Sequence, residues 1–347
     1  MSNMIMRSNA LFFPFISIPR KQWTYHTLLY WDKLASIVPI DHMAQPEKMT
    51  SFMRTLLREG LVENLHPGQY LYEIEAFDSS FKALIESKLQ AVQAIQQRNP
   101  DHKIFGIHRK ALIHAEKLGI VQNYFVEKGL AKKSHDEWYS IEAWAANLFM
   151  AYLASCLGSL TEVNAAPVTN SVQIANLYAN YTGNNISQES SKRSEESRTM
   201  ILKELLPYPD EPIKASTLVK FKEKHGQLLP EFRNRVEGHC INVSKLDSLE
   251  ERILLTQNFI KDSLDEVSYI ESKMKPFWKK LSFSAITPII GAGLSASATQ
   301  LDERVAFAGA AFTLSSTISQ AVSSIREDRR VNNAPLAYVA RSRGKLA

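Results

Sequence analysis

Cysteine is scarce in this chain, and its scarcity excludes a fold held together by disulfides. The 347 residues include two cysteines, Cys156 and Cys240, and both lie in apolar segments with a helical pattern. A disulfide framework needs several paired cysteines, whereas isolated buried thiols are typical of a reducing compartment. The sequence therefore predicts a cytoplasmic protein, with association with the inner membrane through residues 281–325 as the alternative.

A strong charge of one sign is also missing, as are the common catalytic motifs. The net charge is +5 and charged residues make up 22% of the chain, so the composition does not indicate a nucleic-acid-binding protein. There is no Walker loop, nucleophile elbow or HExxH sequence. His108 and His114 are six positions apart, which would place them on different faces of a helix, and neither cysteine has a partner at zinc spacing. We therefore predict no metal and no cofactor.

Charge is absent from two long runs, residues 281–301 and 305–325, which only Asp302, Glu303 and Arg304 separate. Each run is long enough to cross a bilayer, and basic residues outside both ends would suit a hairpin with both termini in the cytoplasm. The runs are nevertheless rich in Gly, Ala, Ser and Thr, which predicts close helix packing in lipid or in water. We expect a small-residue helical hairpin in a helical core, with membrane insertion as the alternative.

Apolar segments with strand and helix patterns alternate in the first half of the chain. Strands are expected over 10–18 and 34–40, with a helix over 21–31 between them, which is the spacing of a βαβ unit. Further strands are expected over 70–77, 103–107, 138–141 and 166–169, and further helices over 49–57, 81–97, 111–128 and 142–160. These patterns predict an α/β domain over residues 1–182.

The rest of the chain is predicted to be helical, so that the protein is mostly α overall. Residues 183–199 contain one aliphatic residue, Ile186, and should form a flexible linker because they cannot bury enough apolar surface. A helical region with a long heptad helix should follow over 200–280. The small-residue hairpin and a basic tail then occupy 281–347.

Apolar residues recur every seven positions over residues 246–277, with Thr256 and Ser263 as polar interruptions. Such a stripe forms a coiled-coil seam with another chain or packs within its own chain. Packing on the hairpin is the favoured interpretation, and a protein partner or a homo-oligomer through this helix is the predicted interaction. The basic tail, residues 326–345, could contact anionic lipid, and a solvated helix end is the alternative.

Polar side chains follow the predicted strands, at the edge where open α/β sheets bind ligands. Carboxylates and imidazoles in such positions can carry out acid–base chemistry. Loops at strand ends are polar in any case, so the same residues could also have no chemical role. The candidate catalytic residues are Asp41, His42, Asp78 and His108, and the candidate ligand-binding residues are Thr169 and Asn170.

Several short motifs are shared with one family: Trp23 with LLYWDK (28–33), Ile37-Val38-Pro39, Ile107-His108, WYSIEAWAANLFMAYLA (138–154), Pro167-Val168-Thr169, LLPYP (205–209) and KFKEKHGQLLPEFRNRV (220–236). Through them the chain, to about Val236, resembles a widespread bacterial family of domains of unknown function. The resemblance implies a bacterial, usually cytosolic protein and implies no reaction. The family has an aspartate after Pro-Val-Thr, where this chain has Asn170, so acid chemistry at that position is in doubt.

Two functions are compatible with these features. The first is an interaction or sensor protein, whose α/β half binds a ligand or partner and whose helical half assembles or meets the membrane. An accessory role in stress response or phage defence would follow by analogy. The second is a hydrolase-like enzyme that uses the acid–base residues at the strand ends. Grouping of the four candidate catalytic residues in one site would favour the enzyme, and their separation would favour the first function.

Overall fold

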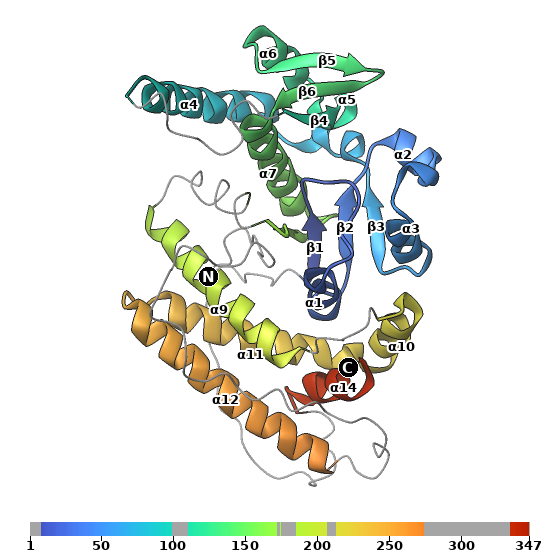
Figure 1. Ribbon diagram of the computed structural model, residues 1–347, viewed down its shortest axis with the longest axis vertical. Coiled ribbons are helices and arrows are strands. Elements are labelled where there is room, and N and C mark those ends of the chain that lie inside the picture. The colour runs from blue at the N-terminus through green and yellow to red at the C-terminus, as the bar shows by residue number, and fades with distance from the viewer. Residues whose placement is uncertain are drawn as a thin grey trace.

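The computed structural model describes residues 8–98, 110–171, 174, 185–206, 213–273 and 334–346. These residues form a parallel sheet (sheet A), a smaller antiparallel sheet (sheet B) and a layer of helices from the C-terminal half (Figure 1). The predicted α/β part followed by a helical part is confirmed, and helices predominate.

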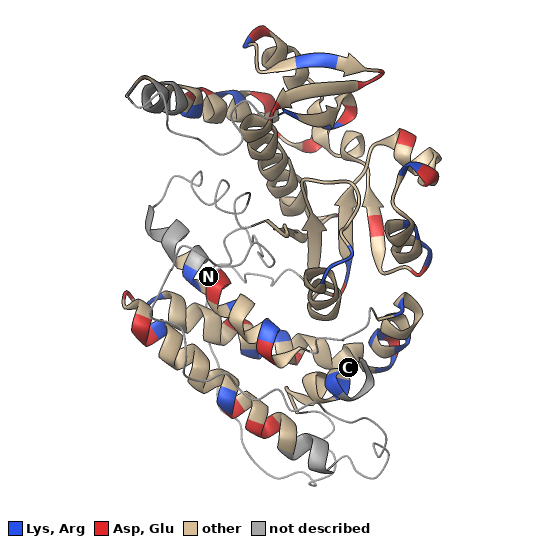
Figure 2. Ribbon diagram, viewed as in Figure 1, with Lys and Arg blue, Asp and Glu red and all other residues tan. Residues whose placement is uncertain are grey.

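Sheet A consists of β1 (Asn9–Phe12), β2 (Leu34–Ile37), β3 (Val62–Leu65) and β7 (Ala165–Val168). The strands are parallel, in the order β3–β2–β1–β7. Glu63 is their only charged residue, as expected for a parallel sheet that is covered on both faces (Figure 2). Alternate residues of the first strand enter two different cores, with Ala10 and Phe12 on one face and Leu11 and Phe13 on the other.

The connecting helices lie on opposite faces of sheet A. Helices α1 (Gln22–Tyr30) and α3 (Ser51–Arg58) share the core of Ala10 and Phe12, whereas α7 (Ala143–Ser159) lies in the core of the other face. The chain therefore runs from β1 to β2 and β3 on one side and later adds β7 on the other. The boundary between β1 and β7 is a topological switch point, where α/β sheets commonly bind ligands.

Helix α7 approaches sheet A closely at its C-terminal end. A Cβ atom on Gly158 would lie 2.3 Å from the carbonyl oxygen of Ala165 in β7. Real Cβ atoms do not come so close to a backbone oxygen. The close packing of β7 against this helix therefore requires a residue without a side chain, glycine, at position 158.

The predicted helix over 111–128 is wrong. Its first residues belong to β4 (Lys110–His114), and two short helices follow, α5 (Ala115–Leu118) and α6 (Val121–Glu127). Gly119 separates these helices with φ +52°, a conformation that interrupts a right-handed helix and that glycine adopts readily. Sheet B pairs β4 with β6 (Trp138–Glu142) and β6 with β5 (Ala131–His135).

The predicted strand over 70–77 is also wrong. The chain there forms the 3₁₀ turns η2 (Pro67–Gln69) and η3 (Leu71–Glu73) and then the start of α4 (Phe77–Arg98). The alternating pattern is misleading because Tyr72 is 79% exposed rather than half-buried on a sheet. The strand expected over 103–107 lies outside the described residues.

The helical layer comprises α9 (Asn185–Leu205), α10 (Ala215–His225), α11 (Leu229–Ser244), α12 (Leu249–Lys273) and α14 (Ala337–Leu346). Its apolar side chains enter the same core as α1: Leu205, Phe232 and Tyr338 belong to one cluster with Trp23 and Leu28. Figure 1 accordingly places α1 between sheet A and this layer. The helical part therefore covers one face of the α/β part.

The flexible linker predicted over 183–199 is replaced by helix α9 from Asn185 onward. Arg198 is buried in it and forms two hydrogen bonds with Glu237 of α11. The next turn of α9 contributes Ile201 and Leu202 to the core. The local composition suggested disorder because it does not reveal a buried ion pair with a residue 39 positions away.

The heptad stripe is covered within the chain over its middle part. Thr256, Ile260, Ser263 and Val267 are buried where α12 packs against α9, α11 and α14. The two polar interruptions therefore lie within the packed face. An external partner for this helix stays a prediction.

The small-residue hairpin expected over 281–325 lies outside the described residues. In the part of the chain that the structure describes, no helix combines the length and apolar character needed to span a bilayer. The described end of the basic tail is helix α14, whose Tyr338 and Val339 are fully buried. Lipid contact stays a prediction for the tail residues that precede Ala334.

Candidate functional site

Two of the four predicted catalytic residues and both predicted ligand-binding residues lie at the carboxyl edge of sheet A. Asp41 and His42 belong to α2 (Ile40–Ala44), which follows β2, and Thr169 and Asn170 follow β7. Strand β1 lies between them, so the two pairs are separated by two strand spacings, about 10 Å. The strand-end rule, which states that open α/β sheets bind ligands at the carboxyl ends of their strands, therefore placed these four residues on one edge.

The other two predicted catalytic residues are not part of this arrangement. Asp78 lies in the first turn of α4 and pairs with Lys82, at 3.2 Å. No contact among the described residues joins Asp78 to Asp41. His108 lies outside the described residues, so its place stays a prediction.

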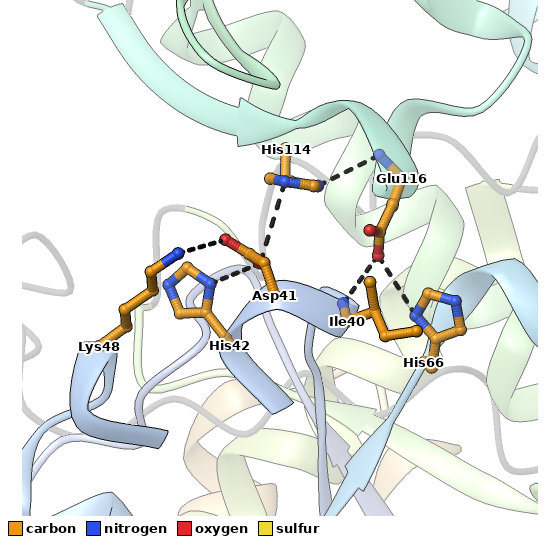
Figure 3. Close-up of polar contacts among 7 residues, drawn as sticks. All are labelled: Ile40, Asp41, His42, Lys48, His66, His114 and Glu116. Carbon is orange, nitrogen blue, oxygen red and sulfur yellow. Dashed lines mark hydrogen bonds and ion pairs between the residues drawn. The ribbon is translucent and has the colours of Figure 1, made fainter. Parts of the chain in front are cut away.

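Asp41 is the centre of a cluster of ionisable side chains (Figure 3). Its Oδ1 accepts a hydrogen bond from His42 Nδ1 at 2.8 Å, and its Oδ2 accepts one from Lys48 Nζ at 3.0 Å. Burial raises the pKa of Asp41, but the hydrogen bonds from His42 and Lys48 outweigh it and lower the pKa to about 2. The carboxylate is therefore ionised at any physiological pH.

Sheet B adds a second imidazole to this carboxylate. His114, the last residue of β4, has its Nε2 3.9 Å from Asp41 Oδ1, and its Nδ1 accepts a hydrogen bond from the backbone N–H of Glu116. The proton of the neutral ring is therefore on Nε2, which faces Asp41. Burial lowers the pKa of His114, although Asp41 and Glu116 oppose this effect.

Glu116 of α5 joins sheet B to the ends of two strands of sheet A. Its Oε2 accepts a hydrogen bond from the backbone N–H of Ile40 at 2.8 Å and lies 3.4 Å from Nδ1 of His66, which follows β3 (Figure 3). The strand-end cluster, as we name it, consists of Asp41, His42, Lys48, His66, His114 and Glu116.

Trp138 of β6 forms an apolar wall beside this cluster. Its ring meets the rings of His42 and His114 edge to face, with centroids 5.7 and 5.2 Å away, and stacks on His135 at 6.4 Å. Such a wall excludes water from one side of the imidazoles and strengthens their interactions with the carboxylates.

The strand-end cluster can transfer protons. An imidazole that donates its Nδ1 proton to an ionised carboxylate has an unprotonated Nε2 when neutral, as in the His–Asp pairs of hydrolases. His42 and Asp41 have this relationship, whereas Nδ1 of His66 lies 3.4 Å from Glu116 Oε2 and makes no hydrogen bond with a described residue. No group of three His, Cys, Asp or Glu residues in the described ranges could hold a metal ion.

The ligand-binding candidates lie at the switch point itself. Thr169 is fully buried, and its Oγ1 accepts a hydrogen bond from the backbone N–H of Ser171. Asn170 Oδ1 is shielded from solvent, and no donor among the described residues reaches it. An amide oxygen of this kind is costly to leave unpaired, and a ligand N–H or O–H group would satisfy it.

Four members of the strand-end cluster were not predicted from the sequence. His66 follows β3 directly, so the strand-end rule would have found it if the short strand VENL had been recognised. Other segments contribute Lys48, His114 and Glu116. The positions of these residues depend on how α2, η1 (Pro46–Lys48) and sheet B pack together. No local motif signals that packing.

Protein-family models, curated proteins and solved structures were compared with the chain, and none of the three comparisons gave a match. The similarity to a bacterial family of unknown function therefore stays a proposal, and the case for function is made from the geometry.

Proposed function

We propose that this chain is a ligand-responsive interaction or sensor protein, in which the carboxyl edge of sheet A binds a small molecule and α1 transmits the binding to the helical layer. One observation carries the proposal: the last turn of α1 is bonded by side chains from three helices of that layer. The first turn of the same helix lies at the carboxyl edge of sheet A. A bacterial accessory role and a partner bound through α12 are parts of this proposal and rest on the resemblance and the heptad pattern.

Lys222 of α10 makes the most extensive contact with α1. Its Nζ donates hydrogen bonds to the carbonyl oxygens of Leu28, Trp31 and Asp32, at 3.0, 2.9 and 2.7 Å. The carbonyl groups at a helix C-terminus lack partners within the helix and carry partial negative charge, so an ammonium group stabilises them. Burial lowers the pKa of Lys222 to about 8, against the effect of Asp32.

Two further helices bond to the same turn. Arg233 of α11 donates to the carbonyl oxygen of Tyr30 and, at 2.6 Å, to Oδ1 of Asp32. The hydroxyl of Tyr338 in α14 donates to the carbonyl oxygen of Leu29, at 2.6 Å. A displacement of α1 would therefore move α10, α11 and α14 or break these bonds.

The N-terminal end of α1 is fastened to the loop that follows β1. Thr24 Oγ1 donates to the carbonyl oxygen of Pro19, and Ser36 Oγ of β2 donates to that of Ile16 at 2.7 Å. A ligand at the switch point would touch this loop, because the loop begins at the carboxyl end of β1. Movement of the loop would then reach the helical layer through α1.

A thermal-shift screen with nucleotides, sugar phosphates, amino acids and short carboxylic acids tests the ligand site. A ligand at a hundred times its dissociation constant stabilises the folded state by about 2.7 kcal/mol. We expect a stabilising compound whose effect is reduced in Asn170→Ala. If every stabilising compound raised the melting temperature of Asn170→Ala as much as that of the wild type, the result would contradict binding at the switch point.

Hydrogen exchange with that compound tests the coupling. We expect slower exchange in α1, α10 and α11 of the wild-type protein. In Lys222→Met the compound should no longer slow exchange in α10, while exchange at the carboxyl edge of sheet A should still become slower. Lys220→Met is the matched control, because Lys220 is exposed on the same helix. Binding at the edge without any change in the helical layer would refute the sensor function.

A hydrolase-like enzyme is the second candidate, and the Asp41–His42 pair is the observation that favours it. His42 Nε2 would accept a proton from a water molecule that attacks the substrate. Turnover of p-nitrophenyl esters or phosphates should then be lost in His42→Ala and kept in Asp78→Asn. Equal turnover by the wild type and His42→Ala would exclude this role.

A further inference from the structure

His114 caps the one-turn helix that fastens sheet B to sheet A. It is the N-cap residue of α5, and its Nδ1 accepts a hydrogen bond of 3.3 Å from the backbone N–H of Glu116. A single helical turn has too few internal hydrogen bonds to form by itself, so it depends on its cap and its packing. Imidazole differs from the usual capping groups, because a proton on Nδ1 removes its ability to accept.

The capped residue, Glu116, also joins the two sheets. Its Oε2 accepts a hydrogen bond from the N–H of Ile40 at 2.8 Å and lies 3.4 Å from Nδ1 of His66, so the side chain reaches the ends of β2 and β3 (Figure 3). On the other side, the N–H of Ala115 donates to the carbonyl oxygen of Glu137 in sheet B, at 2.7 Å. Loss of the cap would therefore free the turn that holds this carboxylate against sheet A. We name the set His114, Glu116 and Ile40 the clamp.

The ring of His114 is buried among charges of both signs. Asp41, whose Oδ1 lies 3.9 Å from Nε2, favours the protonated ring together with Glu116 and Glu137, whereas His42 opposes it. Helix α7, which also packs against β4, contains no charged residue. The pKa of His114 is lowered from 6.5, with burial as the largest cause. The folded protein therefore resists a proton that the opened clamp would accept.

Other charged groups around β4 and α5 do not account for such a change. Glu142 of β6 pairs with Lys110 at the opposite end of β4, and Lys48 donates to Asp41. Burial lowers the pKa of Lys117 in α5 to about 7, so most of these lysines are already charged when the pH reaches 6.5. Among these groups, the ring of His114 is the one that loses a hydrogen bond of the clamp when it gains a proton.

We propose that the junction of the two sheets is a pH-sensitive device, in which protonation of His114 in mild acid opens the clamp. The proton enters at Nδ1, because Nε2 already carries one. The new N–H then faces the N–H of Glu116, while Asp41 attracts the charged ring and keeps it in place. The turn with Glu116 therefore moves away and releases Ile40. Acid would thus expose the ends of β2 and β3; its effect on ligand access rests on the proposed function, but the opening itself does not.

Hydrogen exchange of the full-length protein without ligand, at pH 7.5 and 5.5, tests the opening. Peptides covering 38–44 and 114–120 report it, because they contain the amides of Ile40 and Glu116, and each rate is divided by that of an unstructured peptide at the same pH. We expect protection in both to fall at least about threefold in acid. About tenfold is the limit for one proton and an open-state pKa near 6.5.

Three outcomes would overturn the proposal. The first is unchanged protection in both peptides. The second is greater protection at pH 5.5, which would assign the response to His66, since a protonated ring there would attract Glu116. The third is an equal loss of protection in α7, which would indicate global unfolding rather than an opening at the junction.

Substitutions of His114 separate capping from burial. His114→Asn supplies a capping oxygen that does not titrate, so both peptides should stay protected at both pH values. His114→Ala removes the cap, so protection should be low at both. His135→Asn is the matched control, because His135 is exposed and stacks on the same Trp138 as His114, and it should respond like the wild type.

A wild-type response in His114→Asn would refute the role of His114. If the substitutions prevent folding, the pH profile of the wild-type protein decides alone. Protection should be constant above about pH 7 and decrease below about pH 6.5. A decrease that begins only below about pH 4.5 would belong to carboxylates and would refute the proposal.

Discussion

Arg198 of α9 and Glu237 of α11 face each other through two hydrogen bonds of 2.6 Å, with both side chains buried. Glu237 also accepts a hydrogen bond from the hydroxyl of Tyr30, at 2.5 Å. The pair therefore fixes α9, α11 and the last turn of α1 relative to one another. Its geometry is that of a bidentate arginine–carboxylate pair, which lysine could not reproduce.

Arg198→Met should destabilise the protein by about 3–5 kcal/mol, because it leaves the carboxylate of Glu237 buried without its cation. The double variant Arg198→Met/Glu237→Leu should lose less than the sum of the two single variants. Lys33 and Glu63 form a surface pair, 61% and 55% exposed, and Lys33→Ala should cost less than about 1 kcal/mol. Urea unfolding measures all four variants, and additive losses would contradict a coupled pair.

Gly158→Ala should destabilise the protein by about 1–3 kcal/mol, because its Cβ would meet the carbonyl oxygen of Ala165 and push β7 away from α7. Gly238→Ala in α11 is the matched control. No atom lies within 4 Å of the Cβ that it would add, so the change should stabilise α11 by about 0.5–1 kcal/mol. Melting temperatures that fall for both variants, or rise for both, would contradict the close contact at position 158.

Asp41 should contribute stability that is lost in acid. Its pKa falls from 3.8 in the unfolded chain to about 2 in the folded protein, so the unfolded state binds the proton first as the pH decreases. The contribution is complete above pH 3.8 and disappears between pH 3.8 and about pH 2. Asp41→Asn should lower the free energy of unfolding at pH 7 by about 1–2 kcal/mol and have no effect near pH 2. A constant difference across this range would contradict the prediction.

His239 should cause a second loss at higher pH. Burial lowers its pKa from 6.5 to about 4, so between these values the unfolded chain binds a proton that the folded protein does not. Stability therefore falls as the pH decreases from 6.5 to about 4. His239→Phe would keep the stacking on Phe259 and should flatten this part of the curve. Equal slopes for the variant and the wild type would show that His239 does not titrate in this window.

Much of sheet A was predictable because its signals are local. The apolar runs of β1, β2 and β7, the βαβ spacing around α1 and the apolar character of α7 were recognised correctly. Strand β3 was missed because it is short and contains Glu63 and Asn64, and β5 because Lys132 and Lys133 give it the composition of a loop. Its position at the edge of sheet B allows such residues.

The site was predictable only where it follows from strand order. Asp41 and His42 follow β2 and were expected at the carboxyl edge, whereas His114 and Glu116 arrive there because sheet B packs on α2. The helix predicted over 111–128 hid that possibility, since it placed His114 within a helix rather than at the end of a strand.

The bond between Tyr338 and the carbonyl oxygen of Leu29 joins residues 309 positions apart. During translation the β1–α1–β2 unit therefore leaves the ribosome long before the helices that complete its core exist. Trp23 and Phe12 would meanwhile face solvent or a chaperone, because the cluster that buries them includes Phe232 and Tyr338. Contacts this distant in sequence slow folding and lengthen the exposure of apolar surface. Production of the protein should therefore respond to chaperone supply, and shortening the chain before α14 should reduce its yield before it alters any function.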